Sequence, residues 1–234
     1  MKQSRIIEAA IIGAAIVIFG LLFKVGLDNF TNRNRQVTVK GLSEIEVPAD
    51  QVTWSITTAE TGDDLQRVYA SSSNKINKII TFLKDNGLKD EEIIVGTPLV
   101  NDNETDRWNA DRIPFRFKIK TVLSVTSTDV EKVRGLISRQ GELLEQGIAI
   151  INNEYDNPIS YSFVSFQEMK PKMMEEAIAN AQITAKQFAA TSGSSLGKIL
   201  SADQGQFSIN SKDENTPQIK KLRVVTTITY QLKH

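Results

Sequence analysis

The sequence predicts an α+β fold, with largely antiparallel sheets covered by helices on one face and preceded by a single N-terminal transmembrane helix. Three features of the chain support this prediction. Several segments alternate apolar and polar residues, which is typical of strands with one buried face. Amphipathic stretches with helical spacing lie between these strands. The chain also begins with an uncharged apolar run that has no counterpart later in the sequence.

The apolar run extends from Ala9 to Phe23 and carries no charge. A helix from Ala9 to Leu27 would measure roughly 28 Å at about 1.5 Å per residue, close to the roughly 30 Å of a bilayer core. No small-x-small cleavage site follows the run, which favours a retained anchor over a cleaved signal peptide. The short tail before the run and the large body after it predict a single-pass anchor with the body exported. The residues expected to contact lipid are Ile11, Ile16, Phe19, Leu22 and Phe23.

Strands are predicted wherever the chain alternates with period two. Val52, Trp54 and Ile56 share one face of the clearest example, and Thr53 and Ser55 lie on the other. Two similar segments cover residues 115–125 and 222–232. Shorter strands are expected at Val37–Lys40, Ile93–Val100, Ile148–Ile151, Ile159–Phe166 and Lys198–Ala202.

Three helices are predicted between these strands. The first runs from about Asp63 to Asn86, with Gly87 suited to its C-cap. The second occupies about 129–146. The third begins at Pro171, an acceptable first helical position, and ends at Gly193. Four alanines at spacing four in the third helix predict a ridge that packs closely on its neighbour; they are Ala177, Ala181, Ala185 and Ala189.

The order of these elements indicates an internal duplication. Residues 36–126 and 147–232 both read as strand, strand, helix, strand, long polar loop and strand, which predicts two ββαββ units joined by the helix at 129–146. The two long loops would be 101–112 and 206–218. The domain organisation expected is therefore an anchor and linker over 1–35, followed by one body over 36–234 that contains both units.

The composition excludes several classes of function. Lysine plus arginine and aspartate plus glutamate both number 28, so no basic excess exists to bind nucleic acid. There is no cysteine, which removes thiol catalysis, disulfides and thiolate metal sites. The single histidine is His234, the last residue of the sequence, and because chain ends usually fray we expect no catalytic or metal role for it. We therefore expect no cofactor and no metal.

No motif in the sequence supports catalysis. Asp102, Glu104 and Asp106 resemble the start of a calcium loop, but Arg107 replaces the required glycine and Ile113 replaces the closing glutamate. A solvated hairpin loop is the better interpretation. Gly41 is interpreted as a bulge in the first strand. The protein is therefore predicted not to be an enzyme, with a hydrolase that uses carboxylates alone as the remaining catalytic alternative.

Two sets of residues predict a homo-oligomer, with a ring as one possible arrangement. Ala9, Gly13 and Gly20 form a small-residue stripe on the N-terminal helix, suited to helix contact. Trp108 and Phe207 would lie in the matching loops of the two halves as interface anchors. If one surface meets the other on a neighbouring copy, the head-to-tail contact can close into a ring.

The order of several segments carries a family resemblance. The stretch Val37–Asp50, the alanine ridge, Ser192–Gly197, Ala202–Phe207 and Arg223–Tyr230 together resemble the SIMPL-domain (DUF541) family over 36–232. The resemblance is strongest to bacterial members with an N-terminal membrane anchor. It implies an envelope protein on the inner membrane with its body in the periplasm, without an established catalytic site, with rings in some members and links to stress tolerance in others. A soluble periplasmic binding module with a cleaved leader remains the alternative.

Overall fold

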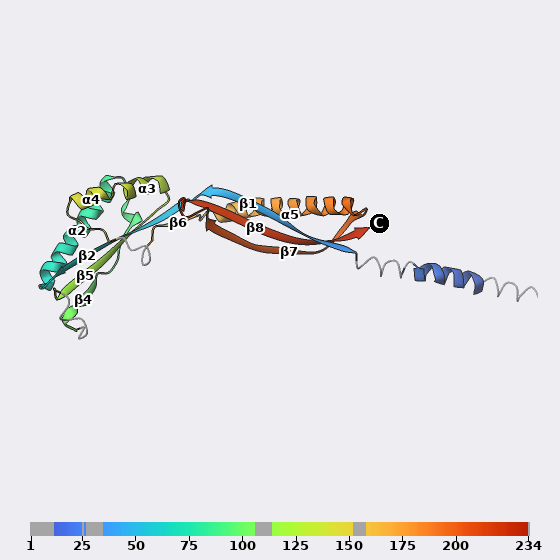
Figure 1. The fold of residues 1–234 in the computed structure, drawn as a ribbon, viewed down its shortest axis with the longest axis horizontal. Coiled ribbons are helices and arrows are strands. Elements are labelled where there is room, and N and C mark those ends of the chain that lie inside the picture. The colour runs from blue at the N-terminus through green and yellow to red at the C-terminus, as the bar shows by residue number, and fades with distance from the viewer. Residues whose placement is uncertain (1–11, 25, 27–34, 106–113, 152–157, 234) are drawn as a thin grey trace, which may run out of the picture. The chain divides into compact units, whose positions relative to one another are not determined.

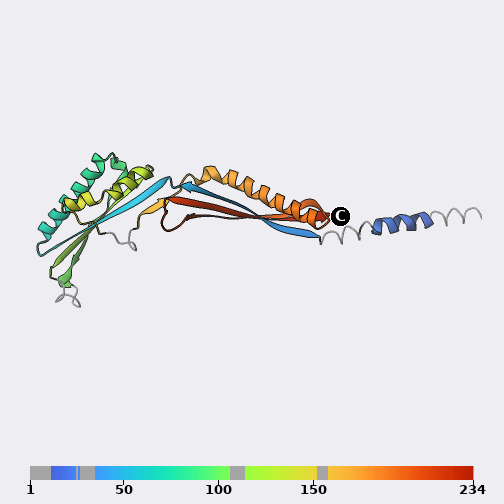
Figure 2. The ribbon, with the colours of Figure 1, turned by 45° about the horizontal axis from the view of Figure 1, so that its top comes forward.

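The computed structural model describes residues 12–24, 26, 35–105, 114–151 and 158–233. The chain forms two compact units, and each unit draws on separate stretches of sequence. Unit 1 consists of Met1–Ile45, Gln167–Ile209 and Lys221–His234, and unit 2 consists of Glu46–Phe166 and Asn210–Lys220. Figures 1 and 2 show the elements of both units in sequence colours.

Unit 2 is built on an antiparallel sheet with the strand order β3-β5-β2-β6, and β4 also pairs with β5. The strands are β2 (Gln51–Gly62), β3 (Ile93–Val95), β4 (Leu99–Asp102), β5 (Phe117–Ser127) and β6 (Ser160–Ser162). In the register of β2 and β5, Trp54 lies opposite Val125 and Ile56 lies opposite Leu123. These four side chains are fully buried, as the alternation in both segments predicts.

Helix α2 (Leu65–Asp85) covers the buried face of this sheet (Figure 1). Asp64 caps its first turn by accepting a hydrogen bond from the Arg67 N–H at 3.1 Å. Gly87, with a φ of 85°, follows its C-cap, as the sequence predicts. The side chains of Ile79 and Leu83 are fully buried against the sheet. Two short 3-10 turns, η1 (Asp90–Glu92) and η2 (Asn103–Thr105), complete this part of the chain.

The helix expected at 129–146 forms as two helices, α3 (Val130–Ser138) and α4 (Gly141–Glu145). The break lies at Arg139 and Gln140, whose N–H groups donate to the carbonyls of Leu136 and Ile137, three residues earlier. This tighter 3-10 pattern ends α3 and turns the chain. Both helices contribute to the core of unit 2, through Val133, Leu136 and Leu143.

Unit 1 contains a sheet with the strand order β1-β8-β7, made of β1 (Gln36–Pro48), β7 (Ser195–Ser211) and β8 (Ile219–Lys233). β1 and β8 are antiparallel, because Thr38 contacts Thr229 while the Leu232 N–H donates to the Arg35 carbonyl. Helix α5 (Phe166–Thr191) lies along this sheet (Figure 2). Its four ridge alanines are buried, which confirms the predicted packing face.

Gly41 in β1 is placed directly under α5. A Cβ atom at this position would lie 1.9 Å from the Ala177 carbonyl oxygen and 2.6 Å from the Ala181 nitrogen. The glycine thus permits the helix backbone to approach the strand, so close packing, rather than the expected bulge, explains why it is required here.

The two units share a βαββ arrangement. Unit 1 runs β1-α5-β7-β8, and unit 2 contains β2-α2-β3-β5 in the same order, with β4 added between β3 and β5 and β6 added at the edge; β1 lies beside β8 as β2 lies beside β5. A repeat therefore exists, but as βαββ rather than ββαββ. The structure also pairs β1 with β8 and β2 with β6, so each sheet combines strands from both of the predicted halves.

Three other expected element positions are wrong. Ile148–Ile151 forms no strand; Ile148 is buried in the core of unit 2 and the Ile151 N–H donates to the Thr57 carbonyl at 2.7 Å. The strand expected at Ile159–Phe166 is reduced to β6, because α5 already begins at Phe166. Pro171 therefore lies inside α5, where it removes one backbone donor.

Residues 12–24 are helical, and their large apolar side chains are exposed. Among the helices of the described residues, none has both the length and the apolar character that crossing a bilayer requires. Ala9 and Ile11, at the start of the expected span, lie outside the described residues.

Candidate functional site

A layer of hydroxyl groups lies between α2 and the sheet of unit 2, beyond the apolar core. Ser72 of α2 and Thr121 of β5 are hydrogen bonded at 3.3 Å, and Thr58 of β2 lies opposite Thr121 in the strand register. All three residues are buried. The Thr58 Oγ1 atom has no hydrogen-bond partner among the described residues. This layer marks the transition from the apolar core to a charged cluster.

Glu60 of β2 forms that charged cluster with two residues of α2. Its carboxylate accepts a hydrogen bond from Ser71 Oγ at 2.9 Å and pairs with the Lys75 ammonium. The side chains of Lys75 and Glu60 are only 27% and 16% exposed. Both carboxylate oxygens of Glu60 are engaged, so the cluster connects α2 to the end of β2. Its role is therefore structural, because Glu60 has no oxygen left to act as a general base.

The acidic turn after β4 is held by an arginine. Arg116 donates to the Asp102 carboxylate at 3.1 Å and lies 2.9 Å from Glu104. The hydrogen bond from Arg116 lowers the pKa of Asp102 below its ordinary value. The rest of the acidic segment, including Asp106 and Asp111, lies outside the described residues. Within the described ranges, no group of three potential metal ligands comes together.

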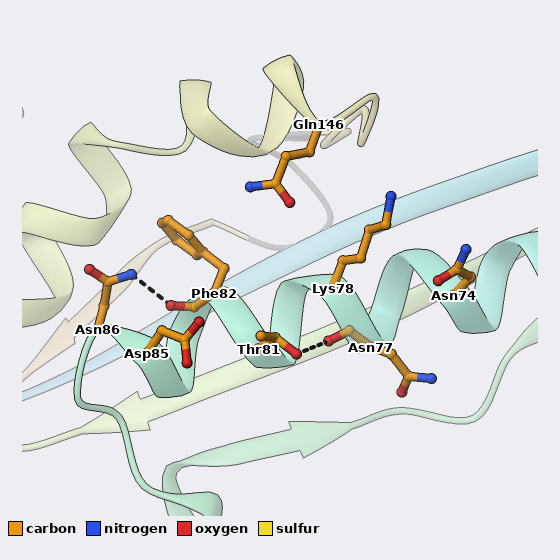
Figure 3. A pocket seen from close by; sticks show the side chains of 8 residues that line it. All are labelled: Asn74, Asn77, Lys78, Thr81, Phe82, Asp85, Asn86 and Gln146. Carbon is orange, nitrogen blue, oxygen red and sulfur yellow. Dashed lines mark hydrogen bonds between the residues drawn. The ribbon is translucent and has the colours of Figure 1, made fainter.

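A polar pocket of about 400 Å³ lies along the outer side of α2 and is closed on one side by the residue that follows α4 (Figure 3). Phe82 contributes its apolar wall, and its ring is covered on another side by the Arg139 guanidinium, 5.9 Å from the ring centroid. The Asn86 side chain bridges these groups, donating to the Phe82 carbonyl and accepting from Arg139, both at 2.7 Å. The lining residues are Asn74, Asn77, Lys78, Thr81, Phe82, Asp85, Asn86 and Gln146.

The sequence analysis did not find this pocket. One signal was available, since Asn74 and Asn77 lie in the interior of a helix, where asparagine is a poor helix former. The contribution of Gln146, by contrast, depends on the break between α3 and α4. No local pattern in the sequence predicts that Gln146 lies near α2.

The residues predicted for an oligomer interface are not brought together by the described structure. Phe207 lies within β7 rather than in a loop, because that strand continues to Ser211. Its half-buried ring lies 5.7 Å from the Lys170 ammonium of α5. Gly13 and Gly20 lie on the N-terminal helix, together with the anchor residues Ile16, Phe19, Leu22 and Phe23. Trp108, like Ala9 and Ile11, lies outside the described residues.

Comparison with known proteins identifies the family. A sequence profile described as "SIMPL: Protein of unknown function (DUF541)" matches residues 37–230. A curated relative from Danio rerio, the "Interleukin-1 receptor-associated kinase 1-binding protein 1 homolog", is 24% identical over 166 residues, or 71% of this chain. The chain spans 61% of the length of that relative. Since the profile covers nearly the whole body, from β1 to β8, the chain belongs to the SIMPL (DUF541) family.

Proposed function

We propose that this protein acts by binding and self-assembly rather than by catalysis, with unit 1 as the assembly module. The observation that carries the proposal is the outer edge of β7, which pairs with no further strand among the described residues. This strand is 17 residues long and lies at the end of the sheet order β1-β8-β7. A long edge strand presents unpaired N–H and C=O groups that can pair with another chain.

The composition of β7 supports this role. Ile199 and Leu200 are adjacent and are 55% and 49% exposed, so apolar side chains point outward on both faces of the strand. Lys198 and Asp203 are its only charged residues. Natural edge strands are commonly protected by charges, prolines or shortness, and β7 has little of this protection. Partner binding at this edge would cover the exposed apolar groups.

A second copy of the chain is the proposed partner. β1 is the other end strand of the same sheet, so β7 of one copy can pair with β1 of the next. Such a contact joins two different surfaces, and repetition of it closes into a ring when the rotation allows. Trp108, at the position where the sequence predicts an anchor, stays a candidate interface residue.

The mass of the full-length protein in detergent, measured by light scattering, tests self-assembly. Ile199→Lys adds a charge at the edge strand and should reduce the mass of the complex. Ile183→Lys is the matched control, because Ile183 of α5 is 53% exposed and lies outside the sheet edge. A wild-type monomer at micromolar concentration, or an equal loss of mass in both variants, would refute the proposal.

We also propose that the N-terminal segment holds the protein in a bacterial inner membrane, with the body in the periplasm and a role in envelope stress tolerance. The uncharged run from Ala9 to Phe23 supports this, as do the exposed side chains of Ile16, Phe19 and Leu22. Mass spectrometry of protein extracted from membranes should find the N-terminal segment intact. A mature chain that begins near residue 28 or later would favour the soluble module with a cleaved leader.

A further inference from the structure

The polar pocket on α2 is lined by several side chains for which the described residues offer no hydrogen-bond or ion-pair partner. Asn74, Lys78 and Asp85 of α2 and Gln146 after α4 make no side-chain hydrogen bond or ion pair within the described part of the chain, and all four are exposed. In Figure 3 the Lys78 and Phe82 side chains rise from α2, and the Gln146 side chain approaches them from the opposite wall. The pocket therefore presents several free polar groups to one space.

The choice of residues in α2 is not explained by folding. Asn74 lies in the middle of a helix of 21 residues, where asparagine is less favourable than alanine, lysine or glutamine. Its side chain does not compensate by bonding to the helix backbone within the described residues. A residue that is unfavourable for its secondary structure and makes no compensating contact is expected at functional positions.

One end of the pocket is rigid, and this favours specific binding. Asn86 is fixed by its hydrogen bonds to the Phe82 carbonyl and to Arg139. Arg139 is fixed in turn by a bidentate contact with Glu142, at 2.6 and 3.0 Å. Phe82, only 7% exposed, cannot move freely between them. Because these side chains are already ordered, the protein loses less conformational entropy when a ligand binds.

The chemistry of the free groups defines the class of ligand. The amides of Asn74 and Gln146 each offer donors and an acceptor, and the Asp85 carboxylate offers acceptors. The charges of Lys78 and Asp85 cancel, which disfavours a strongly charged ligand. Hydroxyl groups both donate and accept, so a neutral polyhydroxylated molecule matches this set, and Phe82 offers an apolar wall for its C–H groups.

We propose that this pocket binds a saccharide of one or two rings. Its volume of about 400 Å³ lies near the lower end of ligand pockets, about 300–1,000 Å³. The site lies wholly within unit 2 and uses none of the residues assigned to assembly in unit 1. The inference therefore goes beyond the proposed function and can fail or succeed independently of it.

Calorimetric titration of the full-length protein tests the proposal, with glucose, maltose, N-acetylglucosamine and N,N′-diacetylchitobiose as probes. The detergent should have a polyoxyethylene head group, because a sugar detergent would compete for the site. We expect saturable binding of at least one probe with a dissociation constant of about 1 mM or tighter. NMR spectra should show that the same probe shifts the side-chain NH₂ resonances of Asn74 and Gln146.

Two double variants separate this pocket from other surfaces. Asn74→Ala/Gln146→Ala should weaken binding at least tenfold. The control Ser73→Ala/Glu145→Ala changes the neighbouring residue at each position, neither of which lines the pocket, and should bind like the wild type. Asp85→Asn, which preserves side-chain shape, should also weaken binding while the melting temperature stays unchanged. Absence of saturable binding for all four probes, or equal affinity in both double variants, would overturn the proposal.

Discussion

Replacing Gly41 by alanine should selectively destabilise the packing of α5 on its sheet. The added Cβ would lie 1.9 Å from the Ala177 carbonyl oxygen, 2.6 Å from the Ala181 nitrogen and 2.8 Å from the Ala181 Cβ. All of these distances are shorter than van der Waals contact. Two of the three atoms belong to the helix backbone, so no side-chain rotation can relieve the clash and the helix itself must move.

The magnitude follows from the cost of overpacking. Inserting a methyl group into a packed core costs about 1–3 kcal/mol, and the rigid backbone contact places Gly41→Ala at about 3 kcal/mol. Alanine also reduces the conformational entropy of the unfolded chain, which stabilises the folded protein by about 0.4–1 kcal/mol. The net destabilisation is therefore about 2 kcal/mol. For a chain of this size, that corresponds to a decrease of about 4–8 °C in the melting temperature.

Gly135→Ala provides the matched control. Gly135 lies within α3, and a Cβ there would meet no atom within 4 Å. The same chemical change should therefore stabilise the protein by about 0.5–1 kcal/mol through helix propensity. Circular dichroism gives the melting temperatures, and hydrogen exchange of the α5 amides locates the effect. The packing argument is refuted if Gly41→Ala melts at or above the wild-type temperature, or if exchange in α5 is unchanged.

Three further predictions concern unit 2. Lys75→Met removes one partner of the Glu60 carboxylate and should lower the free energy of unfolding by about 1–3 kcal/mol in urea, whereas the double variant with Glu60→Gln should recover part of the loss. Burial alone would raise the pKa of Asp50, but hydrogen bonds from Ser165 and from the Val164 N–H, the latter at 2.6 Å, outweigh it and lower the pKa. The stability contributed by Asp50 is thus complete above its ordinary pKa and is lost as the pH falls below about 4, so urea titrations of Asp50→Asn should show a smaller acid loss than the wild type. Leu143→Ala should cost about 2–5 kcal/mol, because the fully buried Leu143 ties α4 to the core; a change below 1 kcal/mol in the same assay would show that α4 contributes little.

The pocket illustrates why part of the candidate site could not be predicted from sequence. Asn74 and Asn77 are recognisable in the sequence as unfavourable residues within a predicted helix, so the wall of the pocket formed by α2 could have been predicted. The opposite wall depends on Gln146, whose position is set by the turn at Arg139 and by the burial of Leu143. The turn is local, but the burial of Leu143 depends on α2 and the sheet, which are far away in the sequence, and periodicity carries no information about which segments meet.

The sequence by itself determined the local character of the chain. Alternation identified β2, β5 and β8, helical spacing identified α2, and the alanine ridge identified the face by which α5 packs, because each pattern reflects which side of an element is removed from water. The tertiary structure decided which elements are partners. β1 pairs with β8 and not with β2, the strand that follows it, and the repeat is therefore βαββ. The alternation of a strand defines which of its faces is buried, but it does not define which other strand will form hydrogen bonds with it. The same reason explains Phe207: whether a polar stretch forms a loop or extends β7 depends on the neighbouring strand β8, which pairs with it only in the folded protein.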